Sequence, residues 1–357
     1  ALYISIFSMK NFLSVSLKIF CGMLIAALLL ELALRILPTC HLPTIASEST
    51  KYIAKPILPN QKVVCSSGWM FQMGNFVEIN ADGFHSGTDY KRCNDDNSVA
   101  FIGDSMVENI MVSSEYLMHP TLARKFVNRG VDVSVYSLGN SGAGLADIVN
   151  FMRLGREIYN VKNFIIKLDY NDIVDDLLQN DGHFVYDFDG DKVLIKLIPK
   201  YRGLEKLKNI SFVCYLFSHA KLSPKSFLAK LKDSLGMKRL KQTKSASTLP
   251  MNLSPKENAL FGQFIADVLK VVDGNPQRVL FLIVDNSTAR PIKETLAKYG
   301  FECVDADTAT HSDSEADLSH FHNDDHWNAR GIERVCSAVE KTEFFERIAN
   351  GRDLKNK

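Results

Sequence analysis

Residues 98–105 read SVAFIGDS, an apolar run that ends in a glycine, an aspartate and a serine. The run predicts a buried strand over Ser98–Ile102 and a tight turn at Gly103 that leads into a helix. Similar apolar runs occur at 163–168 (NFIIKL) and 278–284 (RVLFLIV). Continuous runs of this length are typical of strands that are covered on both faces, as in a parallel sheet.

Helical patterns alternate with strands along the rest of the chain. Further strands are expected at 131–138 and 301–305, and helices at 120–128, 146–158, 261–272, 291–299 and 329–348. This alternation predicts an α/β fold with a doubly wound, mostly parallel sheet that carries helices on both faces. We assign it to residues 98–350.

The composition excludes several classes of protein. With 357 residues, 46% of them hydrophobic and 23% charged, the chain can bury a large core, unlike a disordered or collagen-like protein. Its net charge of +1 gives no general attraction to nucleic acid, and we expect no nucleic-acid partner. Seven cysteines without a CxxC pair are too few for a disulfide-built fold. Cys65 and Cys93 flank one segment and are the candidate pair, although spacing alone does not decide pairing.

The N-terminus carries an apolar run from Phe12 to Leu37. About 20 apolar residues cross a bilayer as a helix. Lys10 and Lys18 precede its uncharged part, Ile19–Leu30, which favours a cytoplasmic N-terminus and an exported remainder. We therefore predict a retained membrane anchor over residues 1–38. A cleaved signal peptide is the alternative, since Ile19–Leu30 also has the length of a signal-peptide core.

Two segments interrupt the regular pattern. Residues 39–97 are rich in Pro, Ser, Asn and Asp, and we interpret them as a linker plus an irregular N-terminal layer, with a turn at 80–83 (NADG). Between Lys192 and Lys244 there are fourteen Lys and Arg residues against two acids. Its apolar spacing suggests amphipathic helices, and we predict a basic helical insertion at about 185–255. A solvated helical face, a dock for anionic lipid headgroups and a dock for an acidic glycan all remain open.

Four polar segments stand in loops beside predicted element ends: Gly103–Ser105, 136–144 (YSLGNSGAG), 168–172 (LDYND) and 323–328 (NDDHWN). Ligands of open α/β sheets bind outside the carboxyl ends of the strands. A backbone N–H at a helix start, a glycine N–H and an Asn amide suit a developing oxyanion, and a His oriented by a nearby carboxylate suits a base. Each segment alone is more typical of a turn or a helix cap.

In this order the four segments resemble the blocks of the SGNH (GDSL-type) hydrolase superfamily, over roughly residues 97–349. The resemblance implies a flavodoxin-like, three-layer α/β/α fold. It implies Ser105 as nucleophile, His326 as general base and Asp324 as the acid that orients His326. The oxyanion hole would comprise the Ser105 N–H, the Gly142 N–H and the Asn171 side chain. No cofactor and no metal is assigned to the site.

The third and fourth segments depart from the usual family pattern. Asp169 stands where the third block usually has a glycine, which puts the backbone path of that loop in doubt. Many members place the acid three residues before the histidine, where this chain has Asn323. Asp324 fits the Asp-x-His-Trp-Asn variant instead, and Asp325 is the alternative acid.

The anchor, the exit segment 31–35 (ELALR) and the segment 80–84 (NADGF) resemble membrane-anchored bacterial members, which implies a single-pass inner-membrane protein with a periplasmic domain. The first expectation is a serine esterase that hydrolyses a small acyl ester, such as an O-acetyl group on a cell-envelope glycan. A polysaccharide O-acetyltransferase is the alternative, and it would need an acyl-donor partner protein. A non-catalytic envelope-binding module and a metal-dependent hydrolase are the remaining hypotheses. The latter would use a group of histidines at His311, His320, His322 and His326, whose spacing matches no standard zinc site.

Overall fold

The fold is that of a computed structural model in which part of the chain is described. The described residues are 2–67, 71, 73–94, 97–178, 182–189, 192–198, 210–215, 253–284, 289–310, 319–321 and 324–351.

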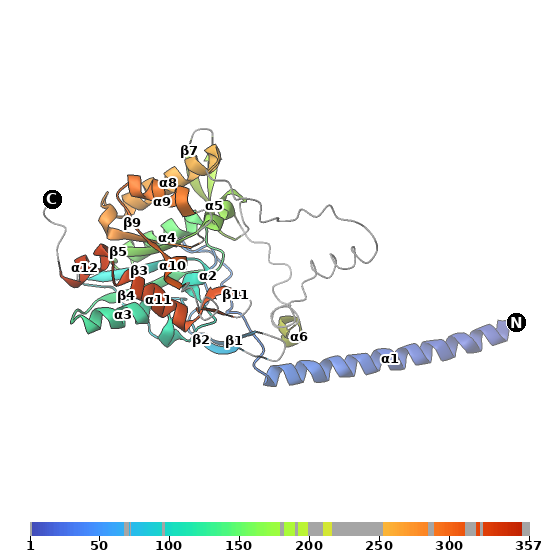
Figure 1. The fold of residues 1–357 in the computed structure, drawn as a ribbon. Coiled ribbons are helices and arrows are strands. Elements are labelled where there is room, and N and C mark those ends of the chain that lie inside the picture. Colours follow the sequence, from blue (N-terminus) through green and yellow to red (C-terminus); the bar gives the residue numbers. More distant parts are fainter. Residues whose placement is uncertain are drawn as a thin grey trace. The chain divides into compact units, whose positions relative to one another are not determined.

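A five-stranded sheet lies at the centre of the larger part of the chain (Figure 1). Its strands are β3 (Ser98–Gly103), β4 (Ser134–Gly139), β5 (Asn163–Leu168), β8 (Val279–Ile283) and β9 (Glu302–Asp305). They lie in the order β4-β3-β5-β8-β9, and every neighbouring pair is parallel. In chain order this is 2-1-3-4-5, the flavodoxin-like arrangement. The predicted fold class is confirmed, and strand β5 has the predicted bounds.

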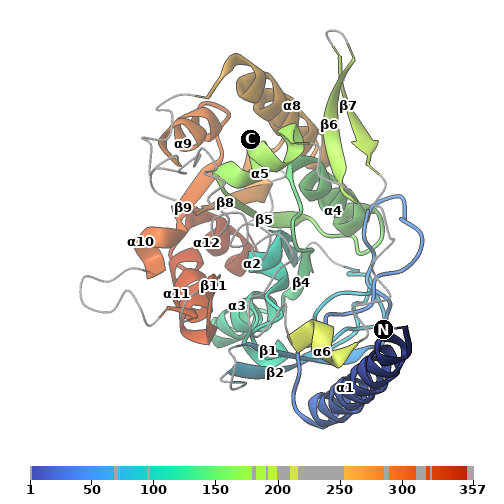
Figure 2. The same ribbon diagram turned by 90° about the vertical axis from the view of Figure 1, so that its right-hand side faces the viewer.

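Helices cover both faces of this sheet, because its strands are apolar on both sides (Figures 1 and 2). Ala100 and Ile102 belong to the core on one face, while Val99 and Phe101 belong to the core on the other, as the period of a strand requires. The first core is closed by α4 (Leu145–Glu157), α8 (Pro255–Val271) and α9 (Ala289–Lys298). The second core is closed by α3 (Met118–Asn128), α11 (Ala329–Val339) and α12 (Glu343–Ala349).

Shorter elements connect and flank these layers. The helical ones are α2 (Ser105–Glu108), η1 (Ser114–Tyr116), α5 (Tyr170–Leu177), α6 (Ser211–Cys214), η4 (Pro276–Arg278) and α10 (Ala306–Thr310). The strands form two-stranded pairs: β1 (Lys62–Ser67) with β2 (Met73–Glu78), β6 (Phe184–Asp189) with β7 (Lys192–Leu197), and β10 (His320–Phe321) with β11 (Asp324–Trp327).

The helices expected at 120–128, 146–158 and 291–299 are formed with bounds that differ by one or two residues, and two others differ more. The helix expected at 329–348 is two helices, because the Thr342 hydroxyl accepts from the Phe345 N–H at 3.1 Å and starts α12 anew. The helix expected at 261–272 begins at Pro255, where Ser254 and Glu257 form a reciprocal capping box.

The start of the predicted insertion is also different. Residues 192–197 form strand β7 of an antiparallel hairpin with β6, so the helical prediction is wrong there. β-Branched Val and Ile at alternate positions favour the strand. Most of the remaining segment lies outside the described residues, and α6 is the helix described within it.

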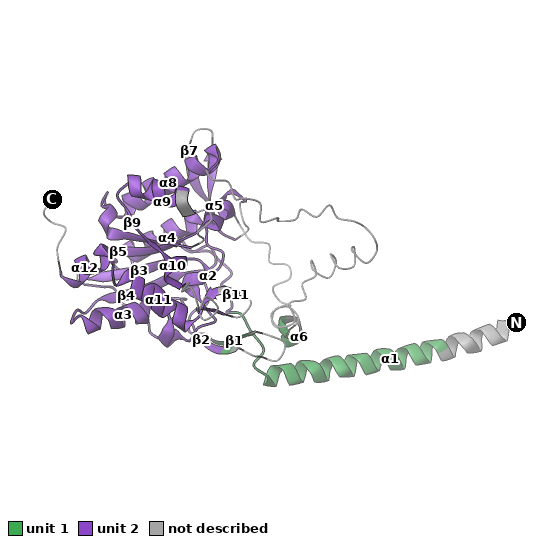
Figure 3. Cartoon of the chain, viewed as in Figure 1, with its two compact units in different colours: residues 1–42, 63–74, 202–241 green, residues 43–62, 75–201, 242–357 purple. Residues whose placement is uncertain are grey.

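The chain divides into two compact units (Figure 3). Unit 1 comprises residues 1–42, 63–74 and 202–241, and unit 2 comprises the rest. In unit 1, helix α1 (Leu2–Ile36) contains a stretch, Phe12–Ile36, with mean hydropathy 2.3, long and apolar enough for a membrane anchor or a signal sequence. In unit 2, the predicted turn at 80–83 is formed, and Gly83 adopts a φ of +84° there.

Candidate active site

The candidate site lies where the direction of the sheet's connections reverses. Strand β3 has β4 on one side and β5 on the other, so the loops after β3 and β5 run to opposite faces of the sheet. A crevice at such a switch point is where open α/β sheets bind ligands. Ser105 follows β3 and Asn171 follows β5, which brings the first and third predicted blocks to this point.

Ser105 is held on a tight strand-to-helix turn. Asp104 caps the short helix α2, since its Oδ1 accepts from the Met106 N–H at 2.9 Å. Gly103 leaves no room for a side chain, because a Cβ there would lie 2.7 Å from the Val107 Cγ2. The helix ends at once at Asn109, which adopts the left-handed conformation with φ +36°. The turn therefore fixes where the Ser105 hydroxyl lies.

His326 reaches Ser105 from strand β11. Its Nε2 lies 2.8 Å from the Ser105 Oγ, and both side chains are half-buried. Asn109 secures β11 by donating from Nδ2 to the Trp327 carbonyl oxygen at 2.7 Å, beside the fully buried Trp327 ring. A neutral imidazole whose Nε2 accepts from a serine hydroxyl is placed to take that proton.

The predicted orienting acid lies on the same strand. Asp324 pairs with Phe321 across the β10–β11 ladder, and Asp325 follows it. The side chains of both aspartates lie outside the described residues. The choice between them therefore stays a prediction.

The two remaining predicted oxyanion donors have no competing hydrogen-bond partner among the residues that the structure describes. Gly142 adopts a φ of +78°, and within the described residues its N–H donates no hydrogen bond. Asn171 is exposed on the first turn of α5, and its side chain forms no hydrogen bond with any described group. Both N–H donors can therefore receive a ligand oxygen.

Glu108 ties helix α2, which begins at Ser105, to residues 139–144, called the glycine loop below, and the sequence analysis did not single it out. Its Oε2 accepts from the Ser141 N–H at 2.8 Å and from the Ser141 hydroxyl. The carboxyl is buried, and burial raises its pKa, while the bonds from Ser141 oppose that shift. An acid at the end of a one-turn helix carries no sequence signal of its own.

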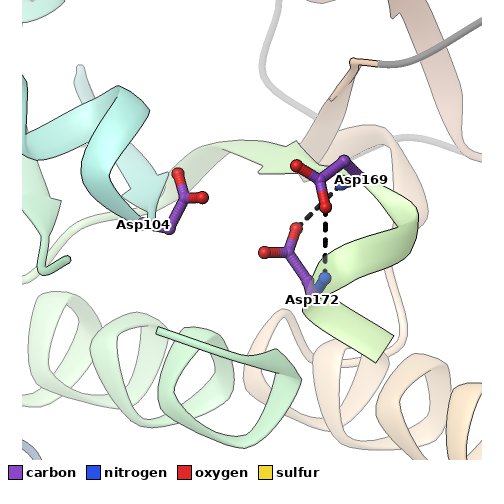
Figure 4. A group of neighbouring side chains, drawn as sticks. All are labelled: Asp104, Asp169 and Asp172. Carbon is purple, nitrogen blue, oxygen red and sulfur yellow. Dashed lines mark hydrogen bonds between the residues drawn. The ribbon is translucent and has the colours of Figure 1, made fainter. Parts of the chain in front are cut away.

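Lys167 is the second feature that the sequence analysis missed. Its side chain is fully buried in β5, and its Nζ lies 2.8 Å from Asp104 Oδ2, 2.7 Å from Asp169 Oδ2 and 3.6 Å from Asp172 Oδ2. The three carboxylates are drawn in Figure 4. Burial alone would lower the pKa of Lys167, but these carboxylates outweigh it and hold the pKa above its usual range. The ammonium thereby joins the loop that carries Ser105 to the loop that carries Asn171.

Asp169, which departs from the family's glycine, does not distort the third block. Its φ of −133° and ψ of 177° are extended values that any residue adopts, so no glycine is required. Asp169 and Asp172 form a reciprocal capping box at the start of α5, with N–H to carboxylate distances of 3.1 and 2.8 Å (Figure 4). The backbone path is therefore regular.

The described residues contain one group of carboxylates close enough to share a metal ion, namely Asp104, Asp169 and Asp172. Because the Lys167 ammonium already contacts these carboxylates, a metal cation there would have to compete with it. Of the predicted histidine group, His311 and His322 lie outside the described residues. Among the residues that are described, neither His320 nor His326 belongs to a metal-sized group.

Comparison with known proteins gives low similarities. No family model matches the chain, and no curated protein matches it. A lipase/acylhydrolase from Enterococcus faecalis is 12% identical with a TM-score of 0.39, over 73% of this chain and 100% of that one. LAE5, an alpha/beta hydrolase enzyme from the metagenome of Lake Arreo, is 12% identical with a TM-score of 0.32, over 70% and 95%. An acetyl xylan esterase from the rumen bacterium Butyrivibrio proteoclasticus is 12% identical with a TM-score of 0.27, over 78% and 67%.

Because these TM-scores are low, the fold is assigned from the strand order and the side-chain geometry of the chain itself. In that order the sheet carries a serine after its first strand, and this serine is hydrogen-bonded to a histidine that precedes the last two helices. The chain has the flavodoxin-like, three-layer α/β/α fold that the resemblance to the SGNH hydrolases predicted. The SGNH-like blocks that carry Ser105, Gly142, Asn171 and His326 all lie in unit 2, which contains the sheet.

Proposed function

We propose that the chain is a serine esterase that hydrolyses a small acyl ester through an acyl-enzyme. The observation that carries this proposal is the 2.8 Å contact between the His326 Nε2 and the Ser105 Oγ at the switch point of the sheet. A nucleophile and a base within hydrogen-bond distance are what acyl transfer requires.

In the proposed mechanism the Ser105 Oγ attacks the acyl carbonyl carbon while its proton passes to the His326 Nε2. The negative oxygen that forms accepts from the Ser105 N–H, the Gly142 N–H and the Asn171 amide. When the intermediate collapses, the alcohol leaves with the proton from His326. Water then attacks the acyl-enzyme by the same steps and releases the acid. Asp324, or Asp325 in its place, orients the ring and stabilises its charged form.

We further propose an O-acetyl group on a cell-envelope glycan as the substrate, with the domain on the periplasmic side of a bacterial inner membrane. The apolar stretch Phe12–Ile36, with Lys10 and Lys18 before its uncharged part, supports the location. If a sugar hydroxyl replaces water at the acyl-enzyme, the same residues act as an O-acetyltransferase supplied by an acyl-donor partner. Adding sugar acceptors to the assay separates the two reactions.

The test is the release of p-nitrophenol from p-nitrophenyl acetate by the full chain in detergent micelles. In subtilisin, loss of the nucleophile costs about 10⁶ in kcat, and we expect Ser105→Ala to lose at least about 10³ here. Ser134→Ala is the matched control, since Ser134 is exposed at the start of β4, the end of the sheet away from the site. A Ser105→Ala variant with wild-type activity would overturn the proposal. Loss of wild-type activity in a metal chelator would favour the metal-dependent hydrolase.

A further inference from the structure

A second histidine pair lies in the core beside the glycine loop. The His183 Nδ1 is 2.6 Å from Asp147 Oδ2, and the two side chains are 8% and 3% exposed. Asp147 lies in the first turn of α4, and its other oxygen accepts from the Phe184 N–H at 3.1 Å. The carboxylate therefore holds the Nδ1–H tautomer and leaves the Nε2 lone pair on the opposite side of the ring.

That side of the ring faces Gly142. A Cβ at position 142 would lie 3.2 Å from the His183 Nε2, so the imidazole packs directly against the glycine. The Lys55 ammonium also contacts the Nε2, which accepts from it because Nδ1 carries the proton. The Lys55 carbonyl in turn accepts from the Asn140 side chain at 3.0 Å. Lys55 and His183 thus support the glycine loop independently of the hydrogen bonds that Ser141 donates to Glu108.

We propose that His183, fixed by Asp147, is a positioning residue that holds the Gly142 N–H where the oxyanion forms. This inference rests on the proposed function. An oxyanion donor lowers the barrier only if it is in place before the charge develops. A displacement on the order of 1 Å costs about 10² in rate, so a rigid ring behind Gly142 has a catalytic consequence without touching the substrate.

The test compares His183→Asn, Asp147→Asn and His119→Asn in the full chain, using p-nitrophenyl acetate. Asn at position 183 can still donate to Asp147 but lacks the part of the ring that packs on Gly142. We expect kcat to fall about 10- to 100-fold with little change in KM, because the donor acts in the transition state. His119, a buried histidine whose ring contacts Ser86 and Tyr90, is the matched control, and His119→Asn should change thermal stability but not kcat.

A second readout follows hydrogen exchange in the peptide that contains residues 139–144. We expect faster exchange in His183→Asn than in the wild type. If kcat and loop exchange both stay at wild-type values while Ser105→Ala is inactive, the inference is wrong and the proposed function stands. If activity does not depend on Ser105, both are overturned.

A separate observation concerns two cysteines in unit 1. The Cys40 Sγ lies 3.8 Å from the Cys65 Sγ. Hydrogen bonds flank the pair on both sides: the His41 N–H donates to the Val64 carbonyl oxygen at 2.9 Å, and the Ser66 hydroxyl donates to the Pro38 carbonyl oxygen. The segment after α1 is therefore aligned with β1 so that the two thiols face each other. The candidate pair Cys65–Cys93 stays a prediction, since Cys93 belongs to unit 2.

We infer that Cys40 and Cys65 form a disulfide in an oxidising solution. In thiol–disulfide exchange with oxidised glutathione, one thiolate attacks glutathione disulfide and releases one glutathione. The second thiolate then displaces the other glutathione. Overall, the two thiols lose two protons and two electrons, and glutathione disulfide is reduced to two glutathione thiols. The bond would join the segment that follows α1 to strand β1.

The test equilibrates the full chain in micelles with oxidised glutathione, blocks remaining thiols with N-ethylmaleimide and maps linked peptides by mass spectrometry. We expect a Cys40–Cys65 link that Cys65→Ser abolishes and that the control Cys336→Ser retains, since Cys336 is buried in α11. Cys214 is the competitor, because its Sγ lies 3.9 Å from the neighbouring His41 Nδ1. A Cys40–Cys214 link, or full alkylation of Cys40 and Cys65, would overturn the inference.

Discussion

The two histidine pairs of unit 2 differ in exposure and in partner. His326 contacts the Ser105 hydroxyl at 2.8 Å, and both side chains are half-buried. His183 contacts the Asp147 carboxylate at 2.6 Å, and both side chains are buried. A base that hands a proton to a leaving alcohol needs access to substrate, whereas a ring that supports a loop needs a fixed position. Exposure and hydrogen-bond partner therefore distinguish His326, the proposed base, from His183, the proposed positioning residue.

The largest expected effect is that of His326→Ala. Without the base, the Ser105 hydroxyl stays protonated in the attack, and we expect kcat for p-nitrophenyl acetate to fall by about 10³ to 10⁶. The same substitution at His183 should cost far less. If the two variants lose equal activity, the distinction between the pairs is wrong.

Gly142→Ala tests both histidine pairs, since the Gly142 N–H is a proposed oxyanion donor and His183 packs against Gly142. A side chain there requires an unfavourable φ of +78° and a 3.2 Å contact with the ring. Alanine keeps the N–H but displaces it. Loss of one oxyanion donor costs about 10²- to 10³-fold in kcat, and we expect a loss of this order.

Gly130→Ala is the control for backbone strain. Gly130 has nearly the same φ, +77°, with nothing within 4 Å of the added Cβ. It should lose stability and keep kcat. Equal losses of kcat in both variants would contradict a specific role for Gly142.

Lys167→Met tests how much a buried ion pair contributes to stability at residues that have no proposed role in the reaction. The substitution leaves Asp104, Asp169 and Asp172 without their ammonium. Removal of one partner of a buried ion pair costs about 3–5 kcal/mol, and we expect the free energy of unfolding in urea to fall by this amount. Lys62→Met breaks the exposed pair with Glu78, and about 1 kcal/mol or less is expected there. A loss at Lys167 no larger than that at Lys62 would contradict this account.

The effect expected at Asp176 depends on pH. Its buried carboxyl accepts from the Ala146 and Tyr186 N–H groups, and burial raises its pKa to about 7. An unfolded Asp has a pKa of about 3.9. Between pH values of about 3.9 and about 7, the Asp176 carboxyl is therefore protonated in the native state and ionised in the unfolded state. The free energy of unfolding should therefore fall as pH rises through this window.

Asp176→Asn removes that titration. The free energy of unfolding should then fall less steeply with pH than in the wild type, by at most about 1.4 kcal/mol per pH unit. Urea unfolding at several pH values between 4 and 7 measures it. The exposed Asp132→Asn is the control and should keep the wild-type slope. An Asp176→Asn slope equal to that of the wild type would show that the carboxyl is ionised throughout.

Local sequence signals predicted the sheet well, because apolar strands such as Asn163–Leu168 carry their own pattern. The four polar segments were also predicted from local signals, because each lies beside the end of a predicted strand or helix. The Lys167 cluster and the His183–Asp147 pair were missed, because their partners are brought together by the fold and not by spacing. Lys167 even stands in an apolar strand, where nothing nearby in sequence explains a buried ammonium. The capping box at Ser254 is also a local sequence signal, and it places the start of α8 at Pro255 instead of the predicted 261.

The nucleophile is tested most directly by covalent labelling of the full chain in micelles with diisopropyl fluorophosphate. The reagent phosphorylates serines that a neighbouring base has activated, and mass spectrometry of the digest locates the adduct. We expect one adduct, on Ser105, that is lost in His326→Ala and retained in Ser134→Ala. An adduct on another serine, or an unmodified Ser105 in a chain that hydrolyses p-nitrophenyl acetate, would contradict the assignment of Ser105 and His326.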